Sequence, residues 1–466
     1  MYIQQLYTNC LAEAAYYIES QGEAAVIDPI RETEAYLELA SDRGATIKYI
    51  FETHFHADFV SGHIDLARKT GAQIIYGPGA HTQYDTYTAR DGERFRLGKL
   101  ELELLHTPGH TPESSCYLLY NEQQQPHALF SGDTLFVGDV GRPDLAVKSD
   151  LSQNDLAGML YDSLRNKILP LPDEVILYPA HGAGSSCGKN IGKETFSTIG
   201  KQRMSNYALQ PMSKTEFITA VTEGLSAPPA YFFEDARINQ QGYAPLEEVH
   251  QRNLQRLGTA EVQKALEAGV LVLDTRPVLE FEKSFIKGSI SIGLDGQFAI
   301  WVGTLISIKQ PLLVVVNQEQ KAHEAITRLA RVGYEHVLGY WVFDGRALEQ
   351  GDLPVDQLQS VHAEEAARQF AAGQALVDVR KPGEWESAHA EGAQHLSLQD
   401  LPEQIKKWPQ APALLHCAGG YRSVIAASLL KRHGIHHITN IYGGWGAMQK
   451  TGAFPVVETA CGQSQV

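Results

Sequence analysis

Six histidine and aspartate side chains in the first 190 residues have the types and spacing that a metal site requires. Each follows a short apolar run or a glycine-containing turn: His54, His56, Asp58, His110, Asp133 and His181. Open α/β proteins bind ligands at the carboxyl ends of their strands, so these imidazole and carboxylate groups are expected to converge. Both groups are metal ligands in proteins. The spacing therefore predicts a metal centre in the N-terminal part of the chain.

A second set of residues, at 413–432, has the pattern of a sulfur-transfer site. An apolar run ends at Cys417, the loop CAGGYR follows, and a helix rich in Ala, Leu and Ile is predicted after it. Backbone N–H groups of such a loop and the helix N-terminus stabilise a thiolate or a persulfide anion. Arg422 can pair with an anionic donor such as thiosulfate or sulfite. We therefore predict that Cys417 and Arg422 are catalytic, with a substrate-binding loop formed by Gly419, Gly420, Tyr421 and Ser423.

The elements that position these side chains are expected to form three domains. Residues 1–190 alternate apolar runs with glycine-rich turns, and 190–245 are predicted to be a helical tail with a linker. The remainder is an internal repeat, because GVLVLDTRPVLEF at 269–281 matches GQALVDVRKPGEW at 373–385. The predicted domains are therefore 1–245, a middle repeat at 246–355 and a C-terminal repeat at 356–466.

The middle repeat keeps the pattern of alternating strands and helices but lacks the thiol. Alignment of the two copies places Val316 at the position of Cys417 and Lys321 at the position of Arg422. A persulfide cannot form without a thiol. We therefore interpret the middle repeat as a structural spacer or a docking platform.

Composition limits the classes of partner. Lys plus Arg is 39 and Asp plus Glu is 55, giving a formal net charge of −16, which argues against binding to nucleic acid or anionic membrane. No apolar run is long enough to span a bilayer, and the N-terminus lacks a signal-peptide pattern. The odd number of cysteines favours free thiols in a reducing, cytoplasmic setting: Cys10, Cys116, Cys187, Cys417 and Cys461.

The motifs HxHxD, TPGHT and GDTLF, with a late histidine after a strand, resemble those of the metallo-β-lactamase superfamily over about 1–245. The resemblance implies an αββα sandwich with the metal at one edge. The CxxGxR loop, LVDVRKPGEWESAHAEGA and IYGGWGAM resemble the rhodanese family over 356–455. The expected fold class is therefore α/β multidomain, with the sandwich followed by two small, doubly wound, rhodanese-like domains.

Within the superfamily, the segments THFHAD, TPGHTPES, GDTLF with GRPD, and YPAH resemble the persulfide dioxygenase branch. This resemblance implies one Fe(II) per chain, held by His54, His110 and Asp133, with His56, Asp58 and His181 orienting ligands and substrate. It also implies that Arg142 shapes the thiol-substrate pocket, although a turn contact with Asp144 is an equal alternative. Phe59 stands where two-metal members have histidine, and a phenyl ring cannot bind a metal, which favours a single metal.

The whole chain thus resembles a persulfide dioxygenase–sulfurtransferase fusion. The expected reaction at iron is RSSH + O₂ + H₂O → RSH + SO₃²⁻ + 2H⁺, where RSSH is glutathione persulfide or another thiol persulfide. Cys417 would then move a sulfane sulfur, making or using thiosulfate. The alternatives are a zinc-dependent thioester hydrolase of the glyoxalase II kind and a non-enzymatic sulfur relay. A homo-oligomer is expected because the first domains of this family often dimerise. Cys187 is either a second thiol near the metal or a structural cysteine.

Overall fold

The computed structural model describes residues 1–146, 151–225 and 227–458, and Cys461 lies outside them. The chain forms two compact units. Unit 1 consists of Met1–Val249 with Leu329–Tyr334, and unit 2 of His250–Arg328 with Glu335–Val466. Among the helices of the described residues, none combines the length and the apolar character needed to cross a membrane.

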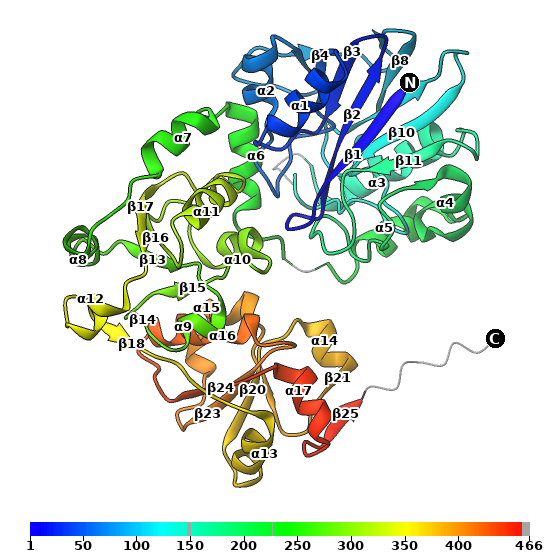
Figure 1. Cartoon of the computed structure of the whole chain (residues 1–466). Coiled ribbons are helices and arrows are strands. Elements are labelled where there is room, and N and C mark those ends of the chain that lie inside the picture. The colour runs from blue at the N-terminus through cyan, green and yellow to red at the C-terminus, as the bar shows by residue number, and fades with distance from the viewer. Residues whose placement is uncertain (147–150, 226, 459–466) are drawn as a thin grey trace. The chain divides into compact units, whose positions relative to one another are not determined.

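Unit 1 contains two six-stranded sheets (Figure 1). The first has the order β1 (Tyr2–Thr8), β2 (Glu13–Ser20), β3 (Glu23–Ile27), β4 (Thr46–Phe51), β5 (Gln73–Tyr76) and β6 (Tyr87–Thr88). The second has the order β12 (Ser197–Thr198), β11 (Ile176–Pro179), β10 (Pro126–Gly132), β9 (Ser115–Tyr120), β8 (Leu100–His106) and β7 (Arg94–Leu97).

The two sheets pack face to face, because one buried cluster combines Ile27 and Phe51 of the first sheet with Leu102 and Phe130 of the second. Strand β8 illustrates the pattern: alternate leucines are buried between the sheets, while Glu101 and Glu103 are partly exposed. Helices α1 (Glu34–Asp42) and α2 (His63–Thr70) cover the first sheet.

The outer face of the second sheet packs against α3 (Gln153–Ser163), α4 (Ile199–Ser205) and α5 (Lys214–Thr222). This is the predicted αββα sandwich. A π-helical turn at Leu164–Ile168 and a 3-10 turn at Tyr207–Leu209 connect these elements. Helix α6 (Phe232–Gln241) follows, and α7 (Leu246–Asn253) leads into unit 2.

Unit 2 contains the C-terminal repeat and most of the middle repeat, each built on a parallel sheet (Figure 1). The first sheet has the order β15 (Ile290–Ser291), β13 (Leu271–Asp274), β16 (Leu312–Val316) and β17 (Val337–Val342). The second has the order β19 (Gln359–Val361), β24 (Ile438–Ile441), β23 (Ala413–His416), β20 (Ala375–Asp378) and β22 (Gln394–His395). Two short pairs join β14 (Phe285–Ile286) to β18 (Val355–Asp356), and β21 (Ala388–Ala390) to β25 (Val456–Glu458).

Helices connect or flank these parallel strands, since neighbouring parallel strands need crossover connections. In the middle repeat they are α8 (Thr259–Glu267), α9 (Val278–Phe281), α10 (Phe298–Leu305), α11 (Gln320–Ala330) and α12 (Gly345–Glu349). In the C-terminal repeat they are α13 (Ala363–Ala371), α14 (Pro382–Ser387), α15 (Leu401–Gln404), α16 (Tyr421–Arg432) and α17 (Gly444–Thr451), with 3-10 turns at Leu398–Asp400 and Ile405–Lys407.

Each repeat has its own buried ion pair at the end of a strand of its parallel sheet. Arg276 lies 2.7 Å from Asp274 after β13, and Arg380 lies 2.6 Å from Asp378 after β20. The predicted fold class is therefore confirmed. The domain boundaries at 245 and 355 stay predictions, since one compact unit holds the C-terminal repeat together with most of the middle repeat, while Leu329–Tyr334 of the middle repeat belong to unit 1.

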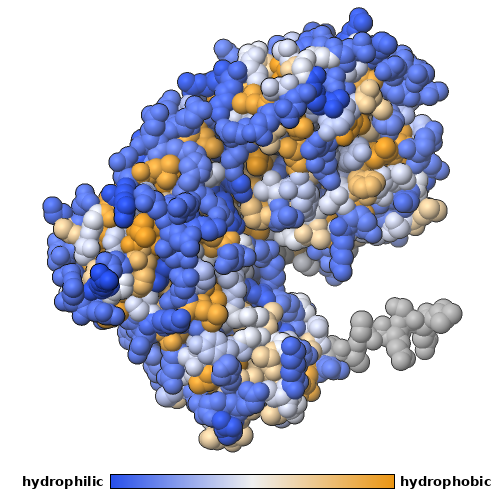
Figure 2. Space-filling model, in the orientation of Figure 1, coloured by the Kyte–Doolittle hydropathy of each residue, from blue (hydrophilic) through white to orange (hydrophobic). Residues whose placement is uncertain are grey.

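The face of the molecule drawn in Figure 2 is mostly hydrophilic, with apolar residues in scattered small groups. Scattered apolar residues are normal on exposed surfaces. This pattern agrees with the acidic composition of the chain.

Candidate metal centre and sulfur-transfer site

His54, His110 and Asp133 meet at one edge of the sandwich. They follow β4, β8 and β10 respectively, and their ligand atoms all lie within 4.8 Å of one another. The Nε2 atom of His110 is 3.3 Å from Oδ2 of Asp133, and Nε2 of His54 is 3.8 Å from the same oxygen. These three atoms are buried and have no hydrogen-bond partner in the described part of the chain. Buried polar atoms are costly without a partner, so this arrangement fits a bound cation.

The other nitrogen of each histidine is held by a hydrogen bond. His110 Nδ1 lies 2.8 Å from the carbonyl oxygen of Arg142, which can only accept, so Nδ1 donates and Nε2 keeps its lone pair. His54 Nδ1 lies 3.0 Å from the hydroxyl of Thr53, which in turn donates to Asp28 Oδ2 at 2.8 Å. Both imidazoles therefore present Nε2 toward the cluster, as metal-binding histidines do.

Thr53 and Asp28 were not predicted as site residues. Their signal in the sequence was weak: Asp28 ends the apolar run AAVID, and Thr53 precedes the first histidine. The backbone N–H of Thr53 also donates to Asp28 Oδ1 at 2.8 Å. Asp28 therefore fixes Thr53 through two hydrogen bonds, and Thr53 fixes the ring of His54.

Asp58, His181 and Cys187 form a second buried group beside the first. His181 connects two carboxylates, with Nδ1 at 2.7 Å from Asp133 and Nε2 at 2.9 Å from Asp58. Burial disfavours the protonated imidazole, but these carboxylates outweigh it and hold the pKa of His181 well above its ordinary value. Burial and the nearby Asp58 carboxylate raise the pKa of the Cys187 thiol well above its usual range. Cys187 thus lies next to residues of the predicted metal centre.

His56 lies in a third buried group, with Asp28 and Glu52. Its Nε2 atom is 3.1 Å from Asp28 and 3.7 Å from Glu52. Burial and the negative charge of Asp28 raise the pKa of Glu52 well above its ordinary value. The ring of Phe59 packs against His56, with ring centroids 4.3 Å apart. Phe59 therefore fills buried space beside these residues with a group that cannot bind metal.

Arg142 takes part in the turn contact that the sequence left as an alternative. Its guanidinium binds both carboxylate oxygens of Asp144, at 2.6 and 2.7 Å. Its backbone carbonyl holds His110, as described above. The structure therefore places Arg142 beside the metal-ligand cluster, and its role in shaping the substrate pocket stays a prediction.

The sulfur-transfer loop lies between β23 and α16. Cys417 is 1% exposed, and the backbone N–H of Gly420 donates to its Sγ at 3.1 Å. Gly420 has a φ of 106°, which only glycine adopts without strain. Ser423 donates from Oγ to the carbonyl of Gly420 at 3.1 Å, which closes the loop onto the first turn of α16. The loop therefore presents a backbone donor to the sulfur, as predicted from its sequence.

Arg422 binds Glu384 through both terminal nitrogens, at 2.6 and 2.8 Å. Both residues line a pocket of about 630 Å³ that contains Cys417. Glu384 was not predicted as a site residue. The signal was its position in KPGEW, which the alignment of repeats did not link to the loop. In the middle repeat, Lys321 instead pairs with Glu324 on the surface, at 2.8 Å.

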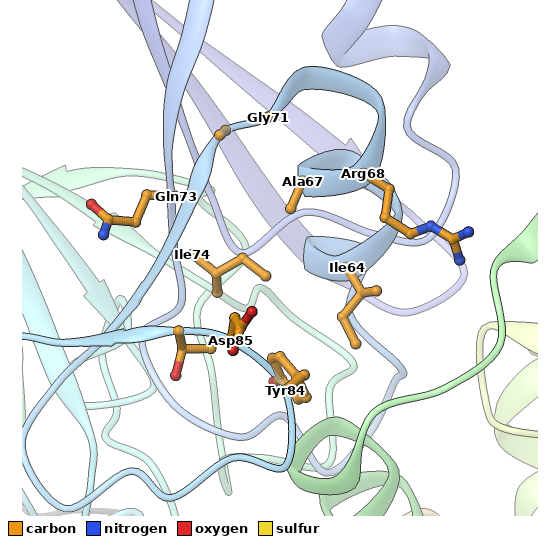
Figure 3. Close-up of a pocket in the computed structure, with 10 residues that line it drawn as sticks. Ile64, Ala67, Arg68, Gly71, Gln73, Ile74, Tyr84 and Asp85 are labelled. Carbon is orange, nitrogen blue, oxygen red and sulfur yellow. The ribbon is translucent and has the colours of Figure 1, made fainter.

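A further pocket, of about 440 Å³, lies over α2 and β5 (Figure 3). The side chains of Ile64, Ile74 and Tyr84 gather around it in the close-up. None of the residues that line it is a predicted site residue. The lining consists of Ile64, Ala67, Arg68, Gly71, Ala72, Gln73, Ile74, Tyr84, Asp85 and Thr86.

Comparison with known families agrees with this geometry. The model of the metallo-beta-lactamase superfamily matches residues 8–181. The model of the rhodanese-like domain matches twice, at 258–341 and 362–451, which correspond to the middle and C-terminal repeats.

Individual relatives extend the comparison. The chain is 32% identical over 199 residues to the human persulfide dioxygenase ETHE1, mitochondrial, covering 42% of this chain and 70% of that protein. It is also 32% identical over 199 residues to a probable hydroxyacylglutathione hydrolase glo2 of Schizosaccharomyces pombe, covering 42% of this chain and 72% of that protein. A crystal structure of a metallo-beta-lactamase from Staphylococcus aureus has a TM-score of 0.65 and 32% identity, covering 73% of this chain and 98% of that one.

Proposed function

Because this chain belongs to the metallo-beta-lactamase superfamily and carries two rhodanese-like domains, we propose that it is a persulfide dioxygenase coupled to a sulfurtransferase. The observation that carries the proposal is the convergence of His54, His110 and Asp133 with three unpartnered, buried ligand atoms. Two histidines and one carboxylate, with other positions left open, are the ligand set of non-haem Fe(II) oxygenases. Similarity to the human persulfide dioxygenase supports the same reaction class.

The proposed cofactor is one Fe(II) per chain, held by His54 Nε2, His110 Nε2 and Asp133 Oδ2. When bound, Fe(II) supplies the redox chemistry with O₂ that zinc lacks. The surrounding residues orient this ligand set: Thr53 positions His54, and His181 positions Asp133. Their contribution is to keep each ligand atom aimed at the site before substrate binds.

Phe59 supports a single metal. It stands directly after Asp58 and is fully buried, with its ring on His56. A histidine at this position would add a ligand to a second metal, whereas the phenyl ring adds none. The proposed reaction consumes RSSH, O₂ and water and releases RSH, sulfite and two protons.

At the second site, we propose that the Cys417 thiolate carries a sulfane sulfur and that the Gly420 N–H stabilises its negative charge. Transfer of that sulfur to sulfite yields thiosulfate, and the reverse reaction uses thiosulfate. Tethering both sites in one chain raises the effective concentration of sulfite near Cys417. We further propose that the protein is cytoplasmic and forms a homo-oligomer.

The decisive experiment is O₂ consumption by iron-loaded protein after addition of glutathione persulfide, with sulfite and thiosulfate measured in the same sample. The proposal expects rapid uptake of one O₂ per persulfide oxidised. Absence of uptake from protein with confirmed iron, across several persulfides, would overturn it.

A zinc-dependent thioester hydrolase is the second candidate. The group of Asp58, His181 and Cys187 favours it, since this group offers ligands for a further metal. The similarity to the probable hydroxyacylglutathione hydrolase also supports this candidate. Metal analysis with a hydrolysis assay on a glutathione thioester separates the two: zinc with thioester turnover would favour the hydrolase.

A further inference from the structure

The pocket at Cys417 takes its walls from both repeats of unit 2. The C-terminal repeat supplies Lys381, Glu384, Cys417, Gly419, Tyr421 and Arg422, and the middle repeat supplies Asp295, Gly296, Gln297 and Trp301. The repeat without a thiol therefore forms one wall of the site that has one. We call this wall, residues 295–297 with Trp301, the middle-repeat wall.

The middle-repeat wall is held in a defined position. Tyr421 donates from its hydroxyl to the carbonyl of Gly293 at 2.7 Å. Its ring lies so close to Gly296 that a Cβ there would approach Tyr421 Cζ to 2.4 Å. From α11, Arg328 donates to the carbonyl of Leu294 at 2.6 Å and to that of Gly296 at 3.2 Å. These bonds fix the wall in front of the Cys417 loop.

The charges around the pocket are balanced. Asp295 and Glu384 are acidic, Lys381 and Arg422 are basic, and Arg422 is already paired with Glu384. A small dianion such as thiosulfate therefore gains little net attraction here, because the two carboxylates of the lining oppose its two basic groups. A molecule that carries both amino and carboxylate groups would match this arrangement better.

The size and the aromatic lining of the pocket also favour an organic ligand over a small inorganic ion. A volume of about 630 Å³ is in the range of pockets that enclose organic ligands rather than small inorganic ions. Trp301 and Tyr421 provide aromatic surface for the carbon atoms of such a ligand. Trp301 is 4% exposed, so its position is fixed by packing.

We propose that the middle-repeat wall makes the Cys417 site selective for an organic persulfide whose carrier thiol bears both amino and carboxylate groups, in preference to thiosulfate. This inference rests on the proposed sulfur-transfer function of Cys417. The step is Cys417–S⁻ + RS–SH → Cys417–S–S⁻ + RSH. A bond forms between Sγ and the terminal sulfur, the bond within the persulfide breaks, and its electron pair leaves on RS⁻, which takes the proton. There is no net oxidation.

The test is the rate at which Cys417 of the full chain becomes persulfidated under anaerobic conditions. Glutathione persulfide, 2-mercaptoethanol persulfide and thiosulfate serve as donors, and mass spectrometry of the Cys417 peptide follows the product. Without O₂ the dioxygenase cannot consume the donor. Peptide analysis separates Cys417 from the other thiols.

Two variants of the wall and one control isolate the effect. Trp301→Ala is expected to lower the rate ratio of glutathione persulfide to thiosulfate at least fivefold relative to the wild type. Asp295→Asn is expected to lower the ratio of glutathione persulfide to 2-mercaptoethanol persulfide at least threefold. Asp352→Asn changes an exposed aspartate of the middle repeat outside the pocket and should leave both ratios unchanged.

Comparing each variant with the wild type cancels the intrinsic reactivity of the donors. Unchanged ratios in both wall variants would overturn the proposal, as would an equal loss with every donor, which indicates a merely structural wall. If Trp301→Ala fails to fold, the exposed Asp295→Asn variant still decides the question. Failure of wild-type Cys417 to react with any donor would instead overturn the proposed sulfur-transfer function.

Discussion

The Nδ1 atom of His181 lies 2.7 Å from Oδ1 of Asp133, while the two histidines of the proposed metal centre approach the other oxygen, Oδ2. One oxygen of the Asp133 carboxylate is therefore held by His181, and the other oxygen faces the two proposed metal ligands His54 and His110. His181 is itself held by Asp58, at 2.9 Å from its Nε2. This division of the two oxygens predicts that ligand and positioning residues respond differently to substitution.

His110→Ala and His181→Asn should separate these roles. His110→Ala removes a ligand atom, so the iron content should fall from about one per chain to less than about a tenth. His181→Asn keeps the three ligands, so it should retain most of the iron but lower the rate of O₂ uptake by about 10–100-fold. Mass spectrometry measures the iron content of each variant, and an oxygen electrode measures its rate of O₂ uptake. Equal loss of iron in the two variants would contradict this assignment.

Thr53→Val should weaken iron binding without removing a ligand. The variant loses the hydroxyl that links Asp28 to Nδ1 of His54, so the ring is no longer fixed. We expect the affinity for Fe(II) to fall about 10–100-fold, measured by competition with a chelator. Thr88→Val, at an exposed position of β6, is the matched control. Equal affinities of the two variants would show that the Thr53 link does not orient His54.

The sequence was sufficient to single out the residues that converge at the metal centre, because each follows a strand or turn with a recognisable pattern. It did not single out Asp28 or Glu52, since one acidic residue after a strand resembles an ordinary surface position. What brings Asp28 to Thr53 is the parallel pairing of β3 with β4, where the N–H of Asp28 donates to the carbonyl of Phe51 at 2.9 Å. Register of this kind depends on tertiary packing.

The middle-repeat wall could not be predicted for a related reason. Residues 294–301 contain no motif of sulfur chemistry. They reach the Cys417 site through the packing of α16 against β15, where the N–H of Ser291 donates to Ser428 Oγ at 3.0 Å. Alignment of the repeats identified a missing thiol but carried no information on how the two copies pack.

Arg380→Met should destabilise unit 2. Arg380 and Asp378 are both buried, and removal of the guanidinium leaves the buried Asp378 carboxylate without its cationic partner. The expected loss in the free energy of unfolding is about 3–5 kcal/mol. All five tryptophans lie between 301 and 445, so tryptophan fluorescence during urea unfolding reports on unit 2.

The matched control is Arg368→Met in the same repeat. Arg368 pairs with Glu365 on the exposed surface of α13, so its loss should cost no more than about 1 kcal/mol. A similar cost for both variants would mean that burial of the Arg380 pair does not determine its contribution.

Glu384 makes the stability of the candidate sulfur-transfer site depend on pH. Burial alone would raise the pKa of this carboxyl, but the Arg422 guanidinium outweighs it and holds the pKa below the ordinary value of 4.5. The folded state thus binds fewer protons, and the ion pair contributes stability above about pH 4.5 that is lost as the pH falls through the lowered pKa.

Glu384→Gln removes this titration. Wild type should be the more stable protein at pH 7, and the difference in the free energy of unfolding should shrink as the pH falls below about 4.5. Urea unfolding followed by tryptophan fluorescence at a series of pH values measures the difference. A difference that is constant across this range, or that grows toward acid, would contradict the pairing of Glu384 with Arg422.

Cys417→Ser should uncouple the two proposed reactions. A serine hydroxyl cannot hold a sulfane sulfur, so sulfite made at the metal centre loses its acceptor site and should accumulate. O₂ uptake should persist, because the metal-ligand cluster lies in unit 1 and Cys417 in unit 2. Thiosulfate output should fall by at least about tenfold. The measurement is sulfite, thiosulfate and O₂ in one reaction with glutathione persulfide.

Cys10→Ser is the control, since Cys10 belongs to neither candidate site. It should leave all three quantities at wild-type levels. Unchanged thiosulfate in the Cys417→Ser variant would refute the coupling, because thiosulfate would then form without the C-terminal thiol. Loss of O₂ uptake in that variant would instead mean that Cys417 takes part in the oxidation step. The substitution changes none of the metal-ligand residues of unit 1, so it should not affect O₂ uptake otherwise.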